Sequence, residues 1–387
     1  MARGTIDDPM VLTVALESDR IQPGHTVWLR GGTYSGDLTS ILQGTAEAPI
    51  IIRNYPGEQA IIDGNVALNG AYTNWIGSHK TGQGIVFTFS GWETRITEIE
   101  GSHPDDIPVK NITAKCDGLQ LINCVIHDMS EVGYWLECKA STFYGNVVFN
   151  LGWLGPDRAH GPACYTQNNT PRRTIKHNVM MNNFGSGIQA YGSSEAYVNY
   201  YDVIGNSLHG SYRANNCLVG GGTVALVPVV SDNNLYQRGK MQIGYTAPAE
   251  DVTYTNNYAP EGEELNVTNY TEQADNWAGP APHPARVTLY PNEYEDEIAL
   301  LTVYNWDSLD TMTVDVSSWA AAGNTLRLRS TQDYFNDTAD VTVAGDGTIA
   351  VDMRAVSHTL AVPLAWTGED WPVNAFPIFG CFIVEKL

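Results

Sequence analysis

Short apolar runs separated by polar turns recur through the first two thirds of the chain. Several of them follow an asparagine, in “INCVIHD”, “GNVVFN”, “HNVMMNN”, “GNSLHG”, “NNLYQ” and “NNYAP”. These asparagines lie 23 to 32 residues apart, at Asn123, Asn146, Asn178, Asn206, Asn234 and Asn257. A repeat of this length that holds short strands and no helix predicts a parallel β-helix. In such a solenoid we expect the asparagines to stack at one turn, because each amide can bond the backbone and the next amide.

Different patterns flank the repeats. Residues 7–19, “DDPMVLTVALESD”, predict a short helix with Asp7 or Asp8 as N-cap and Pro9 in its first turn, which would cap the open end of the solenoid. After the proline-rich stretch “WAGPAPHPAR”, alternating segments that include “IALLTVYNW”, “TLRLRS”, “HTLAVPL” and “FGCFIVEKL” predict a β-sandwich. We therefore expect an all-β chain, with a parallel β-helix domain at 1–280 and a β-sandwich domain at 281–387 that covers or extends the C-terminal end of the solenoid.

The early strands also suggest a family. “PGHTVWLRGGTYSG”, “APIIIRNYPG” and “EQAIIDG” resemble the first coils of right-handed parallel β-helix carbohydrate-active proteins, particularly the chondroitinase-B and alginate-lyase-like polysaccharide lyases. The resemblance covers roughly residues 10–260. It implies a right-handed solenoid and cleavage of a uronate-containing polysaccharide by β-elimination.

The composition limits the partners. A net charge of −22 argues against nucleic acid, whose binding relies on cationic side chains. A polyanionic substrate requires bound Ca²⁺ or a local group of Lys and Arg to offset that field. No apolar stretch approaches the length of a membrane span, and the N-terminus lacks the apolar core of a signal peptide. We expect an extracellular or cell-surface monomer, whose signal would have been removed, and six buried free cysteines without a CxxC pair.

Aligned strands predict which side chains share a face of the solenoid. In “YWLECKAS”, “CYTQNNT” and “IQAYGSS”, alternation along each strand points Tyr134, Leu136, Cys138, Cys164 and Ile188 inward. The expected outward columns are Trp135, Tyr165 and Gln189, then Glu137, Gln167 and Tyr191, then Lys139, Asn169 and Ser193. A sugar presents apolar C–H faces, which aromatic rings contact, and hydroxyl groups, which amides can bond. These columns therefore predict a substrate groove. A register slip of one residue would bury them instead.

The loop at 150–162 is longer than its neighbours and is expected to stand beside this groove, with Trp153 contacting the sugar. The segment “ECKASTFYGNVVFNLGWLGPDRAHG” resembles the lyase region that carries a Lys and an Arg on successive coils and holds Ca²⁺ with Asn and Glu. The resemblance implies Lys139 as base, Arg158 as acid or carboxylate clamp, and Glu137 as calcium ligand. The spacing departs from the family pattern, so His160 and Tyr165 are alternative proton-transfer groups.

Other functions remain open at this point. A glycosidase needs two carboxyl groups across the scissile bond, and Asp157 with Glu137 is the pair that the groove offers, ahead of Glu195 and Asp202. Arg158 and Lys139 could equally form ordinary ion pairs with these same two carboxylates. A non-catalytic sugar-binding protein, such as an adhesin or a phage receptor-binding module, would use the same groove without cleavage. The tryptophans of the predicted sandwich, Trp306, Trp366 and Trp371, could add carbohydrate contacts.

Overall fold

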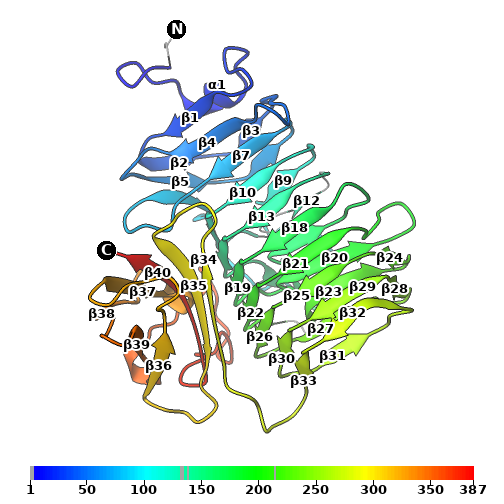
Figure 1. Ribbon diagram of the computed structural model, residues 1–387. Coiled ribbons are helices and arrows are strands. Elements are labelled where there is room, and N and C mark those ends of the chain that lie inside the picture. The colour runs from blue at the N-terminus through cyan, green and yellow to red at the C-terminus, as the bar shows by residue number, and fades with distance from the viewer. Residues whose placement is uncertain (1–3, 131–134, 137–138, 213–214) are drawn as a thin grey trace.

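The computed structural model describes residues 4–130, 135–136, 139–212 and 215–387, with the side chains of residues 135–136 left out. Three long parallel sheets wrap around one core and form a solenoid, and an antiparallel sandwich lies against its side (Figure 1). Each coil contributes one strand to each sheet in turn. Hydrogen bonds join equivalent strands of successive coils, which is the pairing expected of a parallel β-helix.

The three sheets are named A, B and C in the order in which the chain enters them. Sheet A contains β1 (Thr26–Leu29), β4 (Ile50–Asn54), β7 (Thr73–Ile76), β10 (Gln120–Ile122), β13 (Thr142–Tyr144), β18 (Arg173–Lys176), β21 (Tyr201–Ile204), β25 (Val229–Ser231), β29 (Val252–Thr255) and β32 (Tyr270–Ala274). Sheet B contains β2 (Gly32–Ser35), β5 (Gln59–Asp63), β8 (Gly84–Thr88), β11 (Val125–His127), β14 (Val147–Phe149), β19 (Val179–Met181), β22 (Ser207–His209), β26 (Asn234–Tyr236), β30 (Tyr258–Ala259) and β33 (Trp277–Ala278). Sheet C contains β3 (Leu38–Ser40), β6 (Val66–Leu68), β9 (Ile112–Ala114), β12 (Trp135–Leu136), β17 (Cys164–Thr166), β20 (Ile188–Gly192), β23 (Asn215–Gly221), β27 (Lys240–Ile243) and β31 (Glu263–Leu265).

Apolar side chains fill the solenoid in columns. Alternate residues of each strand point inward, and in-register pairing stacks them coil upon coil. One column of sheet A runs through Ile52, Trp75, Leu121, Phe143, Ile175, Val203, Val230 and Tyr254. All of these side chains are buried in one continuous core. The cysteines that the structure describes are buried free thiols, as expected, and Cys138 lies outside the described residues.

An asparagine ladder marks the turn from sheet A to sheet B. Each amide nitrogen donates to the amide oxygen of the next coil at 2.9 to 3.0 Å, through Asn146, Asn178, Asn206, Asn233, Asn257 and Asn276. Stacking is therefore confirmed, but two of the predicted members are wrong. Asn123 adopts positive φ one residue before the ladder position, which Cys124 occupies in that coil. In “DNNLYQ” the ladder takes Asn233, and Asn234 instead begins β26.

The N-terminal cap is shorter than predicted. Helix α1 (Leu12–Leu16) begins after Val11, which makes no side-chain cap, so the prediction of Asp7 or Asp8 as N-cap is wrong. Asp8 instead closes a turn with Thr5, because its carbonyl accepts from the Thr5 amide. The helix still covers the first coil, since Leu12 and Leu16 belong to the solenoid core.

The sandwich pairs one five-stranded antiparallel sheet with a two-stranded one. The larger sheet contains β34 (Arg286–Pro291), β35 (Ile298–Tyr304), β40 (Phe379–Lys386), β37 (Thr325–Ser330) and β38 (Thr338–Thr342), and the smaller contains β36 (Thr311–Asp315) and β39 (Thr348–Asp352). Short 3-10 helices η1 (Thr331–Asp333) and η2 (Ala355–Ser357) lie in its connections. The change of architecture falls between β33 and β34.

The sandwich covers the outer face of sheet B and not the C-terminal end of the solenoid, so the predicted docking position is wrong (Figure 1). Outward residues of sheet B such as Val125, Val147 and Val179 share a core with Leu300, Phe379, Ile383 and other sandwich residues. The strands “VVF” and “VMM” are apolar on both faces, and a strand of that kind must be covered on both sides.

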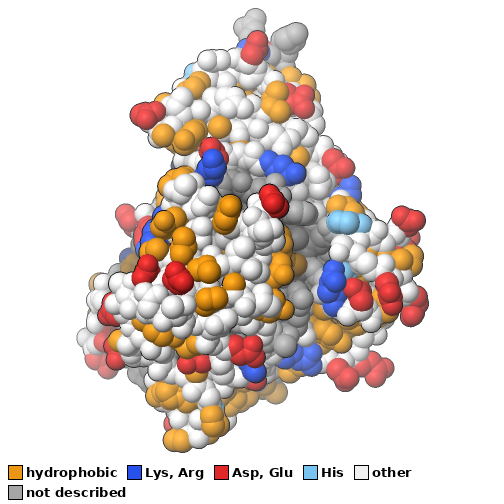
Figure 2. All heavy atoms as spheres, turned by 90° about the vertical axis from the view of Figure 1, so that its right-hand side faces the viewer, with side chains coloured by type: hydrophobic (Ala, Val, Ile, Leu, Met, Phe, Trp, Pro, Cys, Tyr) orange, Lys and Arg blue, Asp and Glu red, His pale blue; other side chains and the backbone are white. Residues whose placement is uncertain are grey.

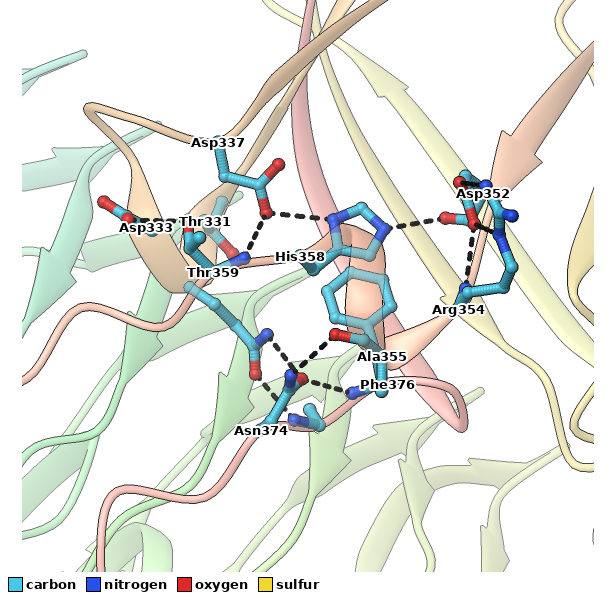
Figure 3. A network of polar contacts seen from close by, with 12 residues as sticks. Thr331, Asp333, Asp337, Asp352, Arg354, Ala355, His358, Thr359, Asn374 and Phe376 are labelled. Atoms are coloured by element: carbon cyan, nitrogen blue, oxygen red, sulfur yellow. Dashed lines mark hydrogen bonds and ion pairs between the residues drawn. The ribbon is translucent and has the colours of Figure 1, made fainter.

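The predicted strand “HTLAVPL” is also wrong, because residues 358–364 form an extended segment without strand pairing. Figure 3 shows how its start is held in place. His358 stacks on the ring of Phe376 at 3.7 Å, its Nδ1 lies 2.9 Å from Asp337 Oδ2, and its Nε2 lies 2.9 Å from the carbonyl of Asp352. The segment then crosses to the solenoid, where the Leu364 amide donates to Asp128.

Candidate functional site

On the outer face of sheet C the predicted register holds from Cys164 to Thr166. The third predicted column is wrong, because Asn168 pairs with Val198 and Asn169 bonds Asn199 instead of lying beside Ser193. Backbone pairing places Trp135 beside Tyr165 and Tyr165 beside Gln189 on successive coils. Cys164 and Ile188 are fully buried, whereas Tyr165 and Gln189 are partly exposed, so the alternation is confirmed. Figure 2 shows the right-hand side of Figure 1, where charged side chains lie scattered over the surface.

Amides connect the aromatic residues of this face. The Nε2 of Gln167 donates to the hydroxyl oxygen of Tyr165 at 3.2 Å and to the carbonyl of Tyr191 at 3.3 Å. The exposed Asn169 accepts a bond from Asn199 at 3.2 Å. The structure therefore brings Tyr165, Gln167 and Tyr191 together, as the alignment predicted.

The 150–162 loop folds into a small antiparallel hairpin, β15 (Trp153–Leu154) and β16 (Ala159–His160), which precedes strand β17. The Trp153 side chain is fully buried against Trp92 and Ile107, so the prediction that it contacts substrate is wrong. Its ring instead supports His160, whose imidazole stacks on it at 3.7 Å. His160 is 9% exposed, so only one edge of the ring reaches the surface.

The tip of the hairpin holds a small ionic cluster. Asp157 lies 3.2 Å from Arg158 Nη1 and 3.4 Å from His160 Nε2, and Arg158 Nη2 donates to Ser102 Oγ at 2.9 Å. Desolvation alone would raise the pKa of Asp157, but the hydrogen bond from His160 and the charge of Arg158 outweigh it and hold that pKa below its ordinary value. Asp157 is therefore an ionised carboxylate at neutral pH, which does not suit the general acid of a glycosidase.

Lys139 and Arg158 approach sheet C from opposite ends of its strands. Lys139 is exposed in the turn that follows β12, whereas Arg158 lies in the hairpin that precedes β17. The ammonium group of Lys139 has no hydrogen-bond or ion-pair partner among the residues that the structure describes, while Arg158 keeps half of its side chain buried against Asp157 and Ser102. Glu137 and the side chain of Trp135 lie outside the described part, so their predicted roles stay predictions.

The other carboxylates proposed for glycosidase chemistry lie elsewhere. Asp202 is on the outer face of sheet A, 2.8 Å from Arg172, and burial raises its pKa. Glu195 is in the turn that follows β20. Within the described ranges, no group of three or more His, Cys, Asp or Glu could hold a metal, and the expected ligand Glu137 lies outside them. Calcium therefore stays a prediction from the resemblance.

The sequence alignment missed the loop that supports the hairpin. Residues 89–111 connect β8 to β9, and their backbone pairs with β15 through Arg95, Thr97 and Leu154. This loop also supplies Ser102, the partner of Arg158, and the fully buried Arg95. The long gap between “GIVFTFS” and “NITAKC” could have indicated an insertion, but only its folded path shows that it meets the hairpin.

The predicted sandwich tryptophans are structural. Trp306 donates from Nε1 to the Tyr258 hydroxyl at 2.9 Å within the interface with sheet B. Trp366 and Trp371 pack with Phe184 beside the hairpin. No described helix is long and apolar enough to cross a membrane.

Comparisons with known proteins agree with this architecture. A family model described as “Right handed beta helix region” matches residues 78–208. Pectate lyase PEL9 of Emericella nidulans is 45% identical over 65 residues, which is 16% of this chain and 16% of that protein, so the match spans a small part of its length.

Two solved structures are similar over a larger share of the chain. An alginate lyase from Paenibacillus sp. str. FPU-7 aligns with a TM-score of 0.41 and 14% identity, covering 70% of this chain and 95% of that one. A mannuronic acid specific polysaccharide family 6 lyase from human gut microbiota aligns with a TM-score of 0.31 and 13% identity, covering 69% and 79%. The coil-by-coil pairing and the family model together identify the chain as a right-handed parallel β-helix protein that resembles polysaccharide lyases.

Proposed function

We propose that this protein is a polysaccharide lyase that cleaves a uronate-containing chain by β-elimination along the outer face of sheet C. The observation that carries the proposal is the connected group of Tyr165, Gln167 and Tyr191, set between Lys139 at one end of the strands and Arg158 at the other. The similarity to the named pectate lyase over 65 residues supports the same class of reaction.

The reaction requires three things of the site. A base removes the proton at C5 of the uronate, the electrons of that bond form the C4=C5 double bond, and the bond from C4 to the glycosidic oxygen breaks. The departing oxygen takes a proton from an acid. A positive charge must also offset the carboxylate, because negative charge builds up on it as the C5 proton leaves.

The residues of the site suit these tasks. Lys139 and Arg158 are the cations that would attract the carboxylates of the chain, and they counter the overall negative charge locally. Tyr165 is the proposed proton-transfer group. The Gln167 amide donates to its oxygen at 3.2 Å, which supports negative charge there when the proton is transferred. His160, held by Trp153 and Asp157, is the second proposed proton-transfer group.

The test is incubation with polygalacturonate, alginate, chondroitin and a neutral glucan. We expect new reducing ends together with the ultraviolet absorbance of an unsaturated uronate on an acidic polysaccharide. Tyr165→Phe removes one oxygen atom and should lower kcat about 100-fold or more. Tyr294→Phe is the matched control, because that tyrosine is 44% exposed on the sandwich, and it should leave kcat unchanged.

Each alternative has a distinct result. Reducing ends without the absorbance would establish hydrolysis, and binding without either product would establish a non-catalytic carbohydrate-binding protein. Full activity in Tyr165→Phe would remove Tyr165 from the proton transfer. Loss of activity in chelator and its recovery with Ca²⁺ would bring the predicted calcium into the site. A substrate of this kind also favours the proposal of an extracellular or cell-surface location.

A further inference from the structure

The face of sheet C continues past the proposed reaction site to a pair of tyrosines. Tyr191, at the end of β20, and Tyr245, in the turn after β27, meet edge to face with ring centroids 5.7 Å apart and planes at 76°. Tyr191 is also the residue whose carbonyl accepts from Gln167. The pair is therefore continuous with the proposed site, and Tyr245 leaves 42% of its surface exposed.

Two glycines lie on the coils that follow Tyr191. Tyr191 pairs with Gly220 on the next coil, and the coil after that continues the same column with Gly244. A Cβ at Gly220 would stand 2.5 Å from the Gly244 backbone, and one at Gly244 would stand 2.1 Å from the carbonyl of Asn266. Glycine at these positions therefore allows successive coils to approach closely at the end of sheet C, beside the contact between Tyr191 and Tyr245.

The spacing suits an extended ligand. Coils of a parallel solenoid lie about 4.8 Å apart, so Tyr245 is about 14 Å along the axis from Tyr165, three coils earlier. Tyr165, Tyr191 and Tyr245 thus lie on the outer face of sheet C, spread along the solenoid axis. A chain lying along this face would pass from the reacting uronate to the exposed ring.

The chemistry of the pair indicates how it would bind. Both side chains are uncharged, and Lys240, at the start of β27, is paired with Glu264 on the next coil at 3.0 Å. An exposed aromatic face binds the C–H face of a pyranose ring, whereas it offers nothing to a carboxylate. The occupant is therefore a sugar ring recognised by its apolar face, whatever substituent it carries.

We propose that Tyr191 and Tyr245 form a distal stacking subsite that takes a pyranose unit of the same polysaccharide, about three coils from the reacting bond. The inference rests on the proposed function, since it takes that polysaccharide as the ligand. It adds that the protein binds a chain of several units, and that recognition at the far end depends on ring stacking and not on charge.

The experiment measures binding of pectate and alginate oligosaccharides of two to eight units in the Tyr165→Phe background by calorimetry. Tyr245→Ala should weaken binding of the long oligosaccharides about tenfold and leave that of the disaccharide unchanged. Tyr245→Phe should retain the affinity, and added salt should not change the ratio between the Tyr245→Ala and parent affinities. Tyr294→Ala is the matched control, because it removes an equally exposed tyrosine in an edge-to-face contact with Tyr144.

Equal affinities of Tyr245→Ala and Tyr294→Ala for long chains would overturn the proposal, as would an equal loss for the disaccharide. Melting temperatures of all variants separate a loss of stacking from a loss of fold. Binding that depends on Tyr245, with no unsaturated product from the protein that retains Tyr165, would refute the lyase function and support the subsite. Unsaturated product, together with an oligosaccharide affinity that does not change in Tyr245→Ala, would support the lyase function and overturn the subsite.

Discussion

Arg95 should be one of the most costly side chains to remove, although it lies in a connecting loop. Its guanidinium is fully buried, 2.5 Å from Asp128 Oδ1, and it donates to the carbonyls of Asn150, Gly152 and Leu364 at 2.6 to 2.9 Å. It also lies 3.9 Å from the centre of the Trp92 ring. One side chain therefore joins the 89–111 loop, the turn before the hairpin, and the segment that returns from the sandwich.

The magnitude follows from what the substitution Arg95→Met leaves behind. Burial lowers the pKa of Arg95 to about 10 against the attraction of Asp128, so the group is charged at neutral pH. Met fills much of the same volume, but it leaves a carboxylate oxygen and three carbonyl oxygens buried without this donor. Asp128 retains hydrogen bonds from His127 and from the Leu364 amide, which reduces the loss of stability. Breaking a buried ion pair on one side costs about 3 to 5 kcal/mol, and we expect a loss in that range.

The assay is urea unfolding at neutral pH, which compares the midpoint and slope of each variant with those of the parent protein. Arg327→Met is the matched control, because Arg327 pairs with Asp340 at 2.7 Å while keeping 26% of its side chain exposed. That pair should contribute less than about 1 kcal/mol. The reasoning that buried polar contacts at Arg95 hold these three segments is refuted if Arg95→Met lowers the free energy of unfolding no more than Arg327→Met does, with an unchanged dependence on urea.

Two further predictions concern stability. Burial lowers the pKa of His209 from 6.5 to about 3, and both of its ring nitrogens lack a partner among the described residues. Below pH 6.5 the unfolded chain binds a proton at His209 that the folded protein does not bind, so the free energy of unfolding of the parent protein falls as the pH drops. His209→Phe lacks this group. In urea unfolding, the parent protein should therefore lose about 2 kcal/mol relative to His209→Phe between neutral pH and about pH 5. A pH-independent difference between the two proteins would contradict this. Asn206→Ala interrupts the ladder at Asn178, Asn233 and the Ile175 carbonyl and should cost about 2 to 3 kcal/mol, whereas Asn336→Ala, on the exposed surface, should cost less than about 0.5. Equal losses for the two asparagines would show that the ladder adds no stability.

Much of the fold could be predicted because a solenoid repeats a local pattern. The alignment of “CYTQNNT” with “IQAYGSS” matches the observed pairing of Tyr165 with Gln189, since in-register coils preserve alternation from one coil to the next. Errors of one residue arose where two asparagines are adjacent or where the ladder position is not asparagine, as at Asn233 and Cys124. Sequence alone cannot tell which of two neighbours adopts positive φ and which points inward.

The candidate site divides in the same way. Tyr165, Gln167 and Tyr191 follow from strand alternation, and the structure brings them together. Trp153 was misplaced because an aromatic residue beside a polar loop has the same pattern whether it faces solvent or supports the loop from beneath. Tyr245 was missed because it lies in a turn after Gly244, outside the alternating part of its strand.

The amino-acid sequence by itself determined the β-helix, the stacking of asparagines and the outward pairing of Tyr165 with Gln189 on sheet C, because each depends on residues one or two positions apart that recur coil after coil. Tertiary structure alone decided that the sandwich covers sheet B, that Arg158 is held by Asp157 and Ser102, and that Tyr191 reaches Tyr245. Most of these contacts join segments far apart in the chain, and loop paths and the packing of side chains set them. No repeating pattern along the sequence encodes such a path.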